Sequence, residues 1–567
     1  MNSCGKTIWL SLGFVLASLV GCSDGVQISG DQEPVVTLSG TLPDLSPHAD
    51  GFAGAYYSGS GQCSTCHDDL QDNEGNDISL VKDWSSSMMA NASRDPYWIA
   101  KVAAESARNP HLQDTLGDTC SRCHAPMAND TARKEDLPIS LASGGLLDTS
   151  NALFDHAMDG VSCTLCHQMD DDGLLGTPEG SSGNFNVLIQ SNPSDRPAYG
   201  PYSDPNGVRM QAQVRFNPVF GEHMGKSEVC ASCHDLQTPS GGHLGVADAT
   251  SSFFPEQMVF SEWRNSSFAE GGENGQTCQS CHMPVVEGAV MLSSEGSGVP
   301  REGFSRHTFL GANTVMQSML MEYSDELGIS VPAARFEESI ERNREFLQSA
   351  AEIDISDSVI QADRLQTRLV IRNRTGHKLP SGFPSRRVYV HFVVRDDSEN
   401  IVFESGALNA DGSVVGLDAD TDSDRYELHY ELIDSAEQVQ VYEAIMGDSA
   451  DRVTHTLMQA SAYLKDNRLL PTGFDKASAP DDIRVAGQAV ADADFQDGGD
   501  EITYQVALPS SGNYTVTAEL VYQPLAFGHI QDLFDDAQLP AVAQFKTLFD
   551  ASALKAEVIA SSTIQVR

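Results

Sequence analysis

Ten cysteines of this 567-residue chain stand in one repeated pattern: two cysteines separated by two residues and followed directly by a histidine. Chance would produce this pattern on the order of 0.01 times in a chain this long. It occurs five times, at Cys63/Cys66/His67, Cys120/Cys123/His124, Cys163/Cys166/His167, Cys230/Cys233/His234 and Cys278/Cys281/His282. The fold must therefore hold five groups, each with two thiols and one imidazole, and each group should bind the same kind of ligand.

The spacing of each set fits the covalent attachment of one haem. Two thiols three residues apart can each bond a vinyl group of the same haem, and the adjacent histidine can then bind the iron. A zinc site would not require a histidine after every pair, and a redox-active dithiol would not recur five times. We therefore predict five c-type haems, bound by the ten cysteines, with the five motif histidines as proximal iron ligands. The other cysteines, Cys4 and Cys22, lie near the N-terminus, which leaves none for a structural disulfide.

Each iron also needs a sixth ligand or an open position, and the sequence has 11 further histidines. His156 and His223 each lie seven residues before the first cysteine of a motif, and His111 lies nine residues before the second motif. His307 follows the fifth motif, and His377 lies in a later segment from which it could reach back to a haem. We predict these as distal ligands: His156, His223, His307, His377 and His111. Weaker alternatives are His48, His243, Met88 and Met89.

The N-terminus has the features of an export signal. Lys6 precedes an apolar run of 13 residues, Ile8 to Val20, which is too short to span a bilayer. The run ends in Leu19-Val20-Gly21-Cys22, which resembles the bacterial lipobox and predicts lipidation at Cys22. An ordinary signal peptide with an incidental cysteine is the alternative. Because Ser23 follows instead of aspartate, we expect an exported lipoprotein anchored at the outer membrane, facing the periplasm or the cell surface.

The chain is too long for one compact core, so we expect several units. We predict a lipoprotein signal peptide over 1–21, a flexible tether over 22–58 and a pentahaem cytochrome c domain over 59–312. A helical connector over 313–354 and a β-sandwich-like C-terminal domain over 355–567 follow. The last boundary is placed where the hydrophobic period changes from that of a helix to strict alternation.

The expected fold class is α+β and multidomain. Its first part is mainly helical and loop-rich and is built around covalent haems, because little polypeptide is available per haem. Asp95-Pro96 predicts the start of a helix that runs to about Arg108. Residues 313–350 also look helical. In the second part, alternating or β-branched runs between turns predict a sandwich. These runs are 365–371, 387–394, 401–403, 439–442, 502–508 and 514–522, with a final helix over 542–554.

The charge balance limits the partners. The chain has 35 Lys+Arg against 80 Asp+Glu, a formal net charge of −45. Nucleic acid and anionic lipid headgroups would be repelled by so acidic a protein. We therefore expect no nucleic-acid partner, a membrane contact through the lipid anchor, and redox protein partners with basic docking surfaces. Such docking should weaken as salt rises.

Several stretches besides the haem motifs are similar to those of exported multihaem c-type cytochromes. They are Gly160-Val161-Ser162-Cys163, Glu262-Trp263-Arg264-Asn265-Ser266, Cys278 to Pro284, Thr375 to Gly382 and Lys465 to Pro471. The chain thus resembles a pentahaem member of that family with a C-terminal β-domain. The resemblance implies low-potential electron transfer through haems with two histidine ligands, arranged in a wire-like series.

The leading hypothesis is a protein that passes electrons along five haems in respiratory or extracellular electron transfer. We favour a non-catalytic electron-transfer protein because all five motifs are alike and distal candidates outnumber the haems. One alternative is a multihaem reductase with one open haem that acts on a small nitrogen or sulfur species. Arg306, Arg386 and Arg387 could then form an anion pocket. The other alternative is a subunit of a conducting cytochrome assembly, against which lipidation at Cys22 argues.

Overall fold

The computed structural model describes residues 51–240, 253–296 and 298–567, and all of these belong to one compact unit. The predicted signal peptide, Cys22, most of the predicted tether, His48 and His243 lie outside the described residues. Within the described ranges, none of the helices combines the length and the apolar character needed to cross a membrane.

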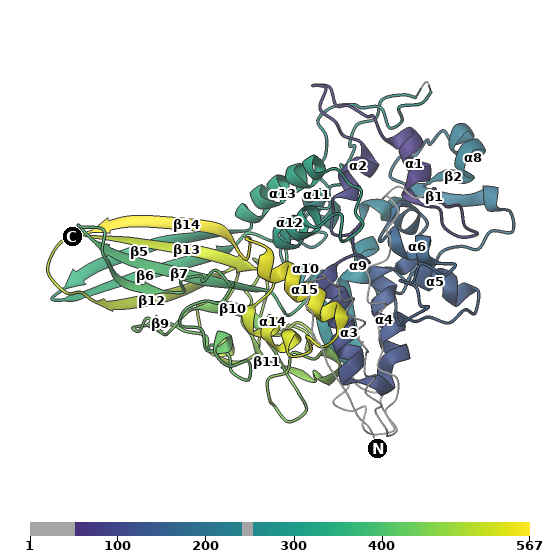
Figure 1. Cartoon of the computed structure of the whole chain (residues 1–567). Coiled ribbons are helices and arrows are strands. Elements are labelled where there is room, and N and C mark those ends of the chain that lie inside the picture. The colour runs from purple at the N-terminus through teal and green to yellow at the C-terminus, as the bar shows by residue number, and fades with distance from the viewer. Residues whose placement is uncertain (1–50, 241–252, 297) are drawn as a thin grey trace, which may run out of the picture. The chain divides into compact units, whose positions relative to one another are not determined.

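The first part of the described chain is built from short helices joined by loops (Figure 1). Five helices carry the cysteine motifs: α1 (Ser60–His67), α4 (Gln113–His124), α7 (Cys163–Cys166), α9 (Glu228–His234) and α11 (Cys278–His282). Between them lie α2 (Leu80–Ser85), α3 (Pro96–Arg108), α5 (Pro126–Lys134), α6 (Phe154–Met158), α8 (Val208–Val214) and α10 (Val259–Arg264). Two small sheets complete this part: β1 (Arg196–Gly200) with β2 (Phe216–Phe220), and β3 (Asp235–Pro239) with β4 (Phe253–Met258).

The helix predicted to start at Asp95-Pro96 is confirmed as α3. The Asp95 carboxylate accepts the backbone N–H groups of Tyr97 and Trp98, which have no partner within the helix. Pro96 fits the first turn because it lacks a backbone N–H. The face of α3 that carries Tyr97 packs against Phe545 near the C-terminus, with the ring centroids 5.4 Å apart.

The helical stretch predicted over 313–350 is divided into α12 (Thr314–Glu322) and α13 (Ala333–Gln348). The interruption contains Gly328 in the left-handed backbone region and ends at Pro332, which directly precedes α13. Both residues favour a break between helices. Two further helices, α14 (Phe527–Phe534) and α15 (Pro540–Ala551), share one apolar cluster with α3 and α12.

The second part is a sandwich of two sheets (Figure 1). The first sheet has the order β11 (Ala462–Asp466), β10 (Val441–Gly447), β7 (Arg387–Asp396), β13 (Tyr514–Gln523) and β14 (Glu557–Val566), and β8 (Ile401–Ser405) also pairs with β7. The second has the order β5 (Ala351–Gln361), β6 (Arg364–Asn373), β12 (Gly499–Ala507) and β9 (Leu432–Ile433).

The two sheets share one apolar core because alternate residues of their strands point inward. Strands β6 and β12 alternate between buried and more exposed positions, as the sequence pattern predicts. Across the interface, Phe392 of β7 stacks on Tyr504 of β12 with ring centroids 3.9 Å apart. The expected α+β class, with a helical part followed by a β-sandwich, is the class that the structure shows.

Candidate haem-binding sites

Each cysteine motif lies at the end of a short helix or forms one. Residues three apart lie on the same side of a helix, so the two thiols of a motif face the same way. All ten motif cysteines are free and partly exposed, and none forms a disulfide. This is the arrangement that a vinyl-bearing cofactor would require.

The ring orientation of the motif histidines leaves one nitrogen available for iron. Nδ1 contacts a backbone carbonyl in four of them: His67 with Leu292 at 2.7 Å, His124 with Ala92 at 2.9 Å, His167 with Tyr199 at 2.6 Å and His282 with Leu310 at 2.6 Å. A carbonyl can only accept, so Nδ1 carries the proton and Nε2 keeps a free lone pair. Burial also lowers the pKa of His124 to about 4, which keeps this imidazole neutral at pH 7.

Two predicted distal histidines lie opposite motif histidines. The ring centroids of His167 and His307 are 6.2 Å apart with planes 14° from parallel. For His282 and His377 the values are 6.4 Å and 13°. A metal ion bound at about 2.0 Å by the nitrogen of each ring would hold two centroids about 6.4 Å apart. Both pairs therefore fit one iron between two imidazoles.

The opposing rings are oriented in the same way as the motif histidines. Nδ1 of His307 contacts the Ser305 carbonyl at 3.1 Å, and Nδ1 of His377 contacts the Lys378 carbonyl at 2.9 Å. In both, Nε2 is thus left for a metal. Burial lowers the pKa of His307 to about 3, so this ring is a neutral donor at pH 7. The donor sets at the third and fifth motifs therefore suit haem iron with two histidine ligands.

The three other predicted distal histidines have different surroundings. His223 is buried, and its Nε2 contacts the Met169 carbonyl at 3.0 Å. His156 packs on Phe52 with ring centroids 4.2 Å apart, and its Nδ1 is buried without a hydrogen-bond partner. His111 is exposed and lies between α3 and α4. Among the described residues, none of these three rings stacks opposite a motif histidine, and their role as ligands stays a prediction.

The fourth motif has a cationic neighbour instead of an opposing imidazole. The side chain of His234 has exposed surface, yet burial lowers its pKa to about 4. The guanidinium of Arg386 also lies close enough to lower the pKa of His234. Arg386 donates to the Ser381 carbonyl at 2.6 Å and forms no ion pair with any carboxylate in the described ranges.

Thiols of different motifs meet inside the fold. In three pairs the thiols lie close enough for one to shift the pKa of the other: Cys63 with Cys163, Cys123 with Cys233, and Cys230 with Cys278. These contacts join the first motif to the third, the second to the fourth and the fourth to the fifth. Cys166 also lies close enough to Cys233 for the two thiols to interact electrostatically, which links the third motif to the fourth. The five motifs therefore form one connected set, with the fourth next to three others.

The two thiols of the first motif have different surroundings. The sequence gives Cys66 the same role as Cys63, but in the described ranges only the Cys63 thiol reaches a thiol of another motif. Cys66 is held instead through its backbone, because its carbonyl accepts the N–H of Ser294 at 2.8 Å and the Ser294 hydroxyl at 3.2 Å. Its thiol is partly exposed and free. Bonding of a haem vinyl group by Cys66, as by the other nine motif cysteines, stays a prediction.

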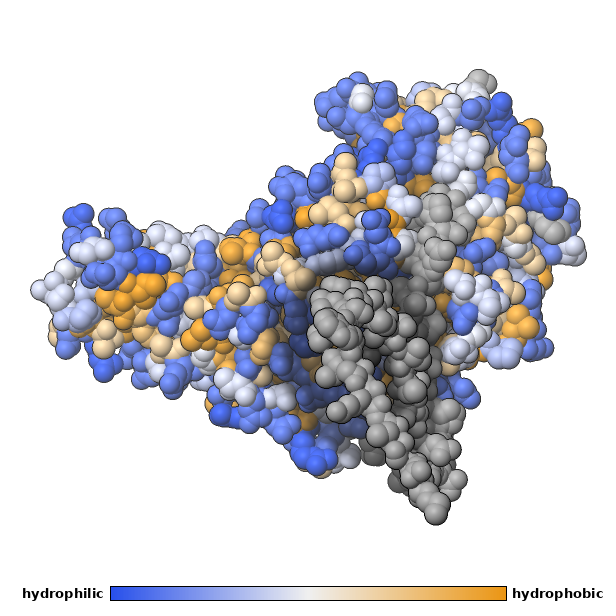
Figure 2. Space-filling view, viewed as in Figure 1, coloured by the Kyte–Doolittle hydropathy of each residue, from blue (hydrophilic) through white to orange (hydrophobic). Residues whose placement is uncertain are grey.

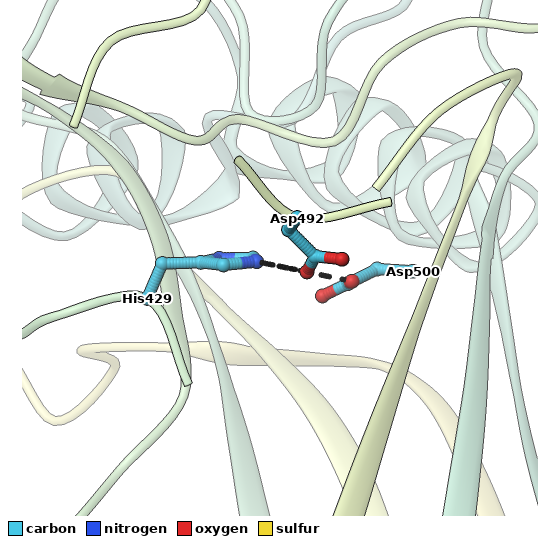
Figure 3. A group of neighbouring side chains, drawn as sticks. All are labelled: His429, Asp492 and Asp500. Carbon is cyan, nitrogen blue, oxygen red and sulfur yellow. Dashed lines mark hydrogen bonds and ion pairs between the residues drawn. The ribbon is translucent and has the colours of Figure 1, made fainter. Parts of the chain in front are cut away.

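A second group of metal-ligand side chains lies in the β-sandwich (Figure 3). The nearest ligand atoms of His429, Asp492 and Asp500 all lie within 4.8 Å of one another, and the three residues are buried. Nε2 of His429 is 2.8 Å from Asp492 and 3.9 Å from Asp500. Asp500 also accepts the hydroxyl of Tyr442 at 2.5 Å.

Hydrogen bonds to Nδ1, on the other side of the His429 ring, determine whether Nε2 carries a proton and so whether His429 can bind a metal. Nδ1 receives the side-chain amides of Gln440 and Asn467, each at 3.0 Å. The oxygens of both amides accept backbone N–H groups, which fixes their orientation. Nδ1 is therefore an acceptor, so Nε2 carries the proton and donates it to Asp492. Because a metal would need that lone pair free, we assign the group a structural role.

Neither a family model nor a curated protein matches this sequence. Among solved structures, the chain is similar to a penta-heme cytochrome c552 from Thermochromatium tepidum. The two are 15% identical, and the alignment covers 89% of this chain and 98% of that chain, with a TM-score of 0.49.

Proposed function

We propose that this chain is a pentahaem c-type cytochrome that transfers electrons. The observation that carries the proposal is the pairing of His167 with His307 and of His282 with His377 at the separation that one iron requires. Each of these pairs adjoins a cysteine motif of the haem-attachment type. When bound, a c-type haem supplies an iron centre that gains and loses one electron.

The arrangement of the motifs supports transfer between them. If each motif bonds one haem, thiols that lie close together across two motifs bring the edges of two haems near one another. The first and third motifs, the second and fourth, the third and fourth, and the fourth and fifth are linked in this way. The chain therefore supplies a connected series in which the fourth motif is a junction.

The protein residues set the properties of these sites. Carbonyl contacts at Nδ1 hold the imidazoles in place and make them stronger donors. Ligation by two histidines gives a lower reduction potential than ligation by histidine and methionine. These features suit low-potential electron transfer better than binding of a substrate at the third and fifth motifs.

The proposed location is the outer membrane, with Cys22 as the lipidated residue, and the proposed partners are redox proteins with basic docking surfaces. Hydrophilic side chains cover much of the face shown in Figure 2. Many of the 35 Lys+Arg already pair with carboxylates, for example Arg108 with Asp532 and Arg301 with Asp204. Most of the 80 Asp+Glu are therefore left to attract a cationic surface.

A multihaem reductase is the second candidate, and one observation favours it. The fourth motif has the Arg386 guanidinium near His234, with no carboxylate ion-paired to it, and no opposing imidazole among the described residues. An open iron beside a cation would suit a small anion such as nitrite. At the third and fifth motifs the opposing histidines leave no such position.

Electron paramagnetic resonance of the oxidised, haem-loaded protein separates the two candidates. Low-spin signals for all five haems, unchanged by nitrite or cyanide, would support the electron carrier and overturn the reductase. A high-spin haem whose signal shifts on adding either ligand would support the reductase. The variant His234→Ala would then identify the responding haem, because loss of the His234 imidazole should remove the ligand-sensitive high-spin signal.

A further inference from the structure

Three stretches that resemble those of multihaem cytochromes converge in one buried ionic cluster. Glu262 lies on α10, Lys378 follows His377, and Asp466 and Arg468 lie at and just beyond the end of β11. We call these four charged residues the ionic clamp: Glu262, Lys378, Asp466 and Arg468. No chemistry could be assigned to these stretches from the sequence alone.

The contacts within the ionic clamp are short and form a chain of alternating charge. Lys378 Nζ lies 2.7 Å from an oxygen of Asp466. Arg468 binds both oxygens of Asp466, at 2.8 and 2.7 Å, and lies 2.9 Å from Glu262. Two cations and two carboxylates thus neutralise one another.

Because the cluster is buried, its charges fix positions more than they add net stability over an apolar cluster. The exposed fractions of the side chains are 0% for Lys378, 1% for Asp466, 8% for Arg468 and 0% for Glu262. A buried ionic cluster is often no more stabilising than an apolar one of the same shape, because the charges lose their hydration. Its paired contacts do, however, fix the geometry of the segments that carry it.

The segment that the ionic clamp fixes is the one that carries His377. The N–H of Lys378 donates to Glu262 at 3.2 Å, which ties the residue after the histidine to α10. The carbonyl of His377 accepts from the Asn373 amide at 2.8 Å and from the Thr375 hydroxyl at 2.7 Å. The backbone on both sides of His377 is thereby held.

We propose that Glu262 and Asp466 are positioning residues that hold His377 opposite His282. The fifth haem site is then completed only when the segment around His377 is bound to α10, so residues 59–312 alone cannot complete it. The state of the ionic clamp determines whether the iron at the fifth motif has two imidazole ligands or one. This inference rests on the proposed function, because it requires a haem at His282.

The test uses the full-length, haem-loaded protein with the variant Glu262→Gln. The amide keeps the shape of Glu262 but removes the charge that faces Arg468. The matched control is Asp420→Asn, which breaks a buried ion pair of 2.7 Å with Arg387 and does not touch the segment around His377. The variant His377→Ala gives the signal expected when the ligand is lost completely. All proteins are compared by covalent haem content and by paramagnetic resonance of the oxidised state.

We expect five haems in each protein. Glu262→Gln should show a high-spin signal of up to one fifth of the iron, as His377→Ala does, and added imidazole should convert that signal to low spin. Asp420→Asn should show no such signal.

The inference is overturned if Glu262→Gln stays fully low-spin, if Asp420→Asn gains the same signal, or if His377→Ala leaves the spectrum unchanged. If Glu262→Gln does not fold, Arg468→Lys, which keeps the charge but loses the two-point contact, is judged in the same way. Fewer than five haems in the parent would instead overturn the proposed function.

Discussion

The substitution Asp466→Asn tests how much the buried ion pairs of Asp466 contribute to folding. Burial alone would raise the pKa of Asp466, but its two cationic partners, Arg468 and Lys378, hold it at about 2, below the ordinary value of 3.8. At about 1.4 kcal/mol per pH unit, this shift corresponds to about 2–3 kcal/mol of stability. The variant also leaves Lys378 without a carboxylate partner among the described residues. We therefore expect a loss between about 2 and 5 kcal/mol in the free energy of unfolding at pH 7.

The pH dependence follows from the direction of the shift. Because the folded-state pKa lies below the unfolded one, the contribution of Asp466 is complete above about pH 4 and disappears as pH falls through about 2. Between these values the parent should lose stability more steeply than Asp466→Asn. Denaturant unfolding followed by far-ultraviolet circular dichroism measures both quantities.

The matched control for this prediction is Asp354→Asn on β5. Asp354 pairs with Arg372 at 2.9 Å, but the two side chains are 63% and 43% exposed. An exposed pair contributes about 0 to 1 kcal/mol, so the control should remain close to the parent. The reasoning is refuted if Asp466→Asn loses less than about 1 kcal/mol, or if both variants lose the same amount.

Four further predictions concern other parts of the molecule. His307→Ala should give a high-spin signal of up to one fifth of the iron, since His167 would keep no opposing imidazole; an unchanged resonance spectrum would contradict the assigned pair. Replacing Cys278 and Cys281 together by alanine should reduce the covalent haem content from five to four, and retention of the fifth would contradict attachment there. His429→Gln should cost about 1–3 kcal/mol in thermal or denaturant unfolding, because buried hydrogen bonds are lost. A metal chelator should not shift the melting temperature of the parent, and a shift would show that His429 binds an ion.

Local patterns predicted much of the fold. The helix α3 follows from Asp95 and Pro96, whose capping chemistry acts over a few residues. Strands such as β6 and β12 follow from alternation, because one face of each is buried, whereas β7 and β10 are buried on both faces and follow from β-branched and apolar runs. Strand β14 was not predicted, because Ser561, Ser562 and Thr563 interrupt its apolar pattern. Pairing with β13, including a contact between Thr517 and Thr563 at 3.1 Å, makes it a strand.

The candidate site residues also fall into two groups, those that local sequence patterns predict and those that only the fold brings together. The cysteine motifs are local and could be found from the sequence. The choice of opposing histidine could not, because His307 and His377 are brought to their motifs by tertiary packing. The sequence drew attention to the stretches with Glu262 and Asp466, but only the fold shows that they meet. The His429 group gave no sequence signal, because its members come from separate segments.

The central claim is that this chain binds five haems covalently, and the most direct test is its haem content. The pyridine haemochrome spectrum, combined with the protein concentration and the intact mass of the denatured protein, gives the number of haems that remain bound to the chain. We predict five haems per chain with the spectrum of haem c, matching the five motifs. A different number, or haem that separates from the denatured chain, would contradict the account.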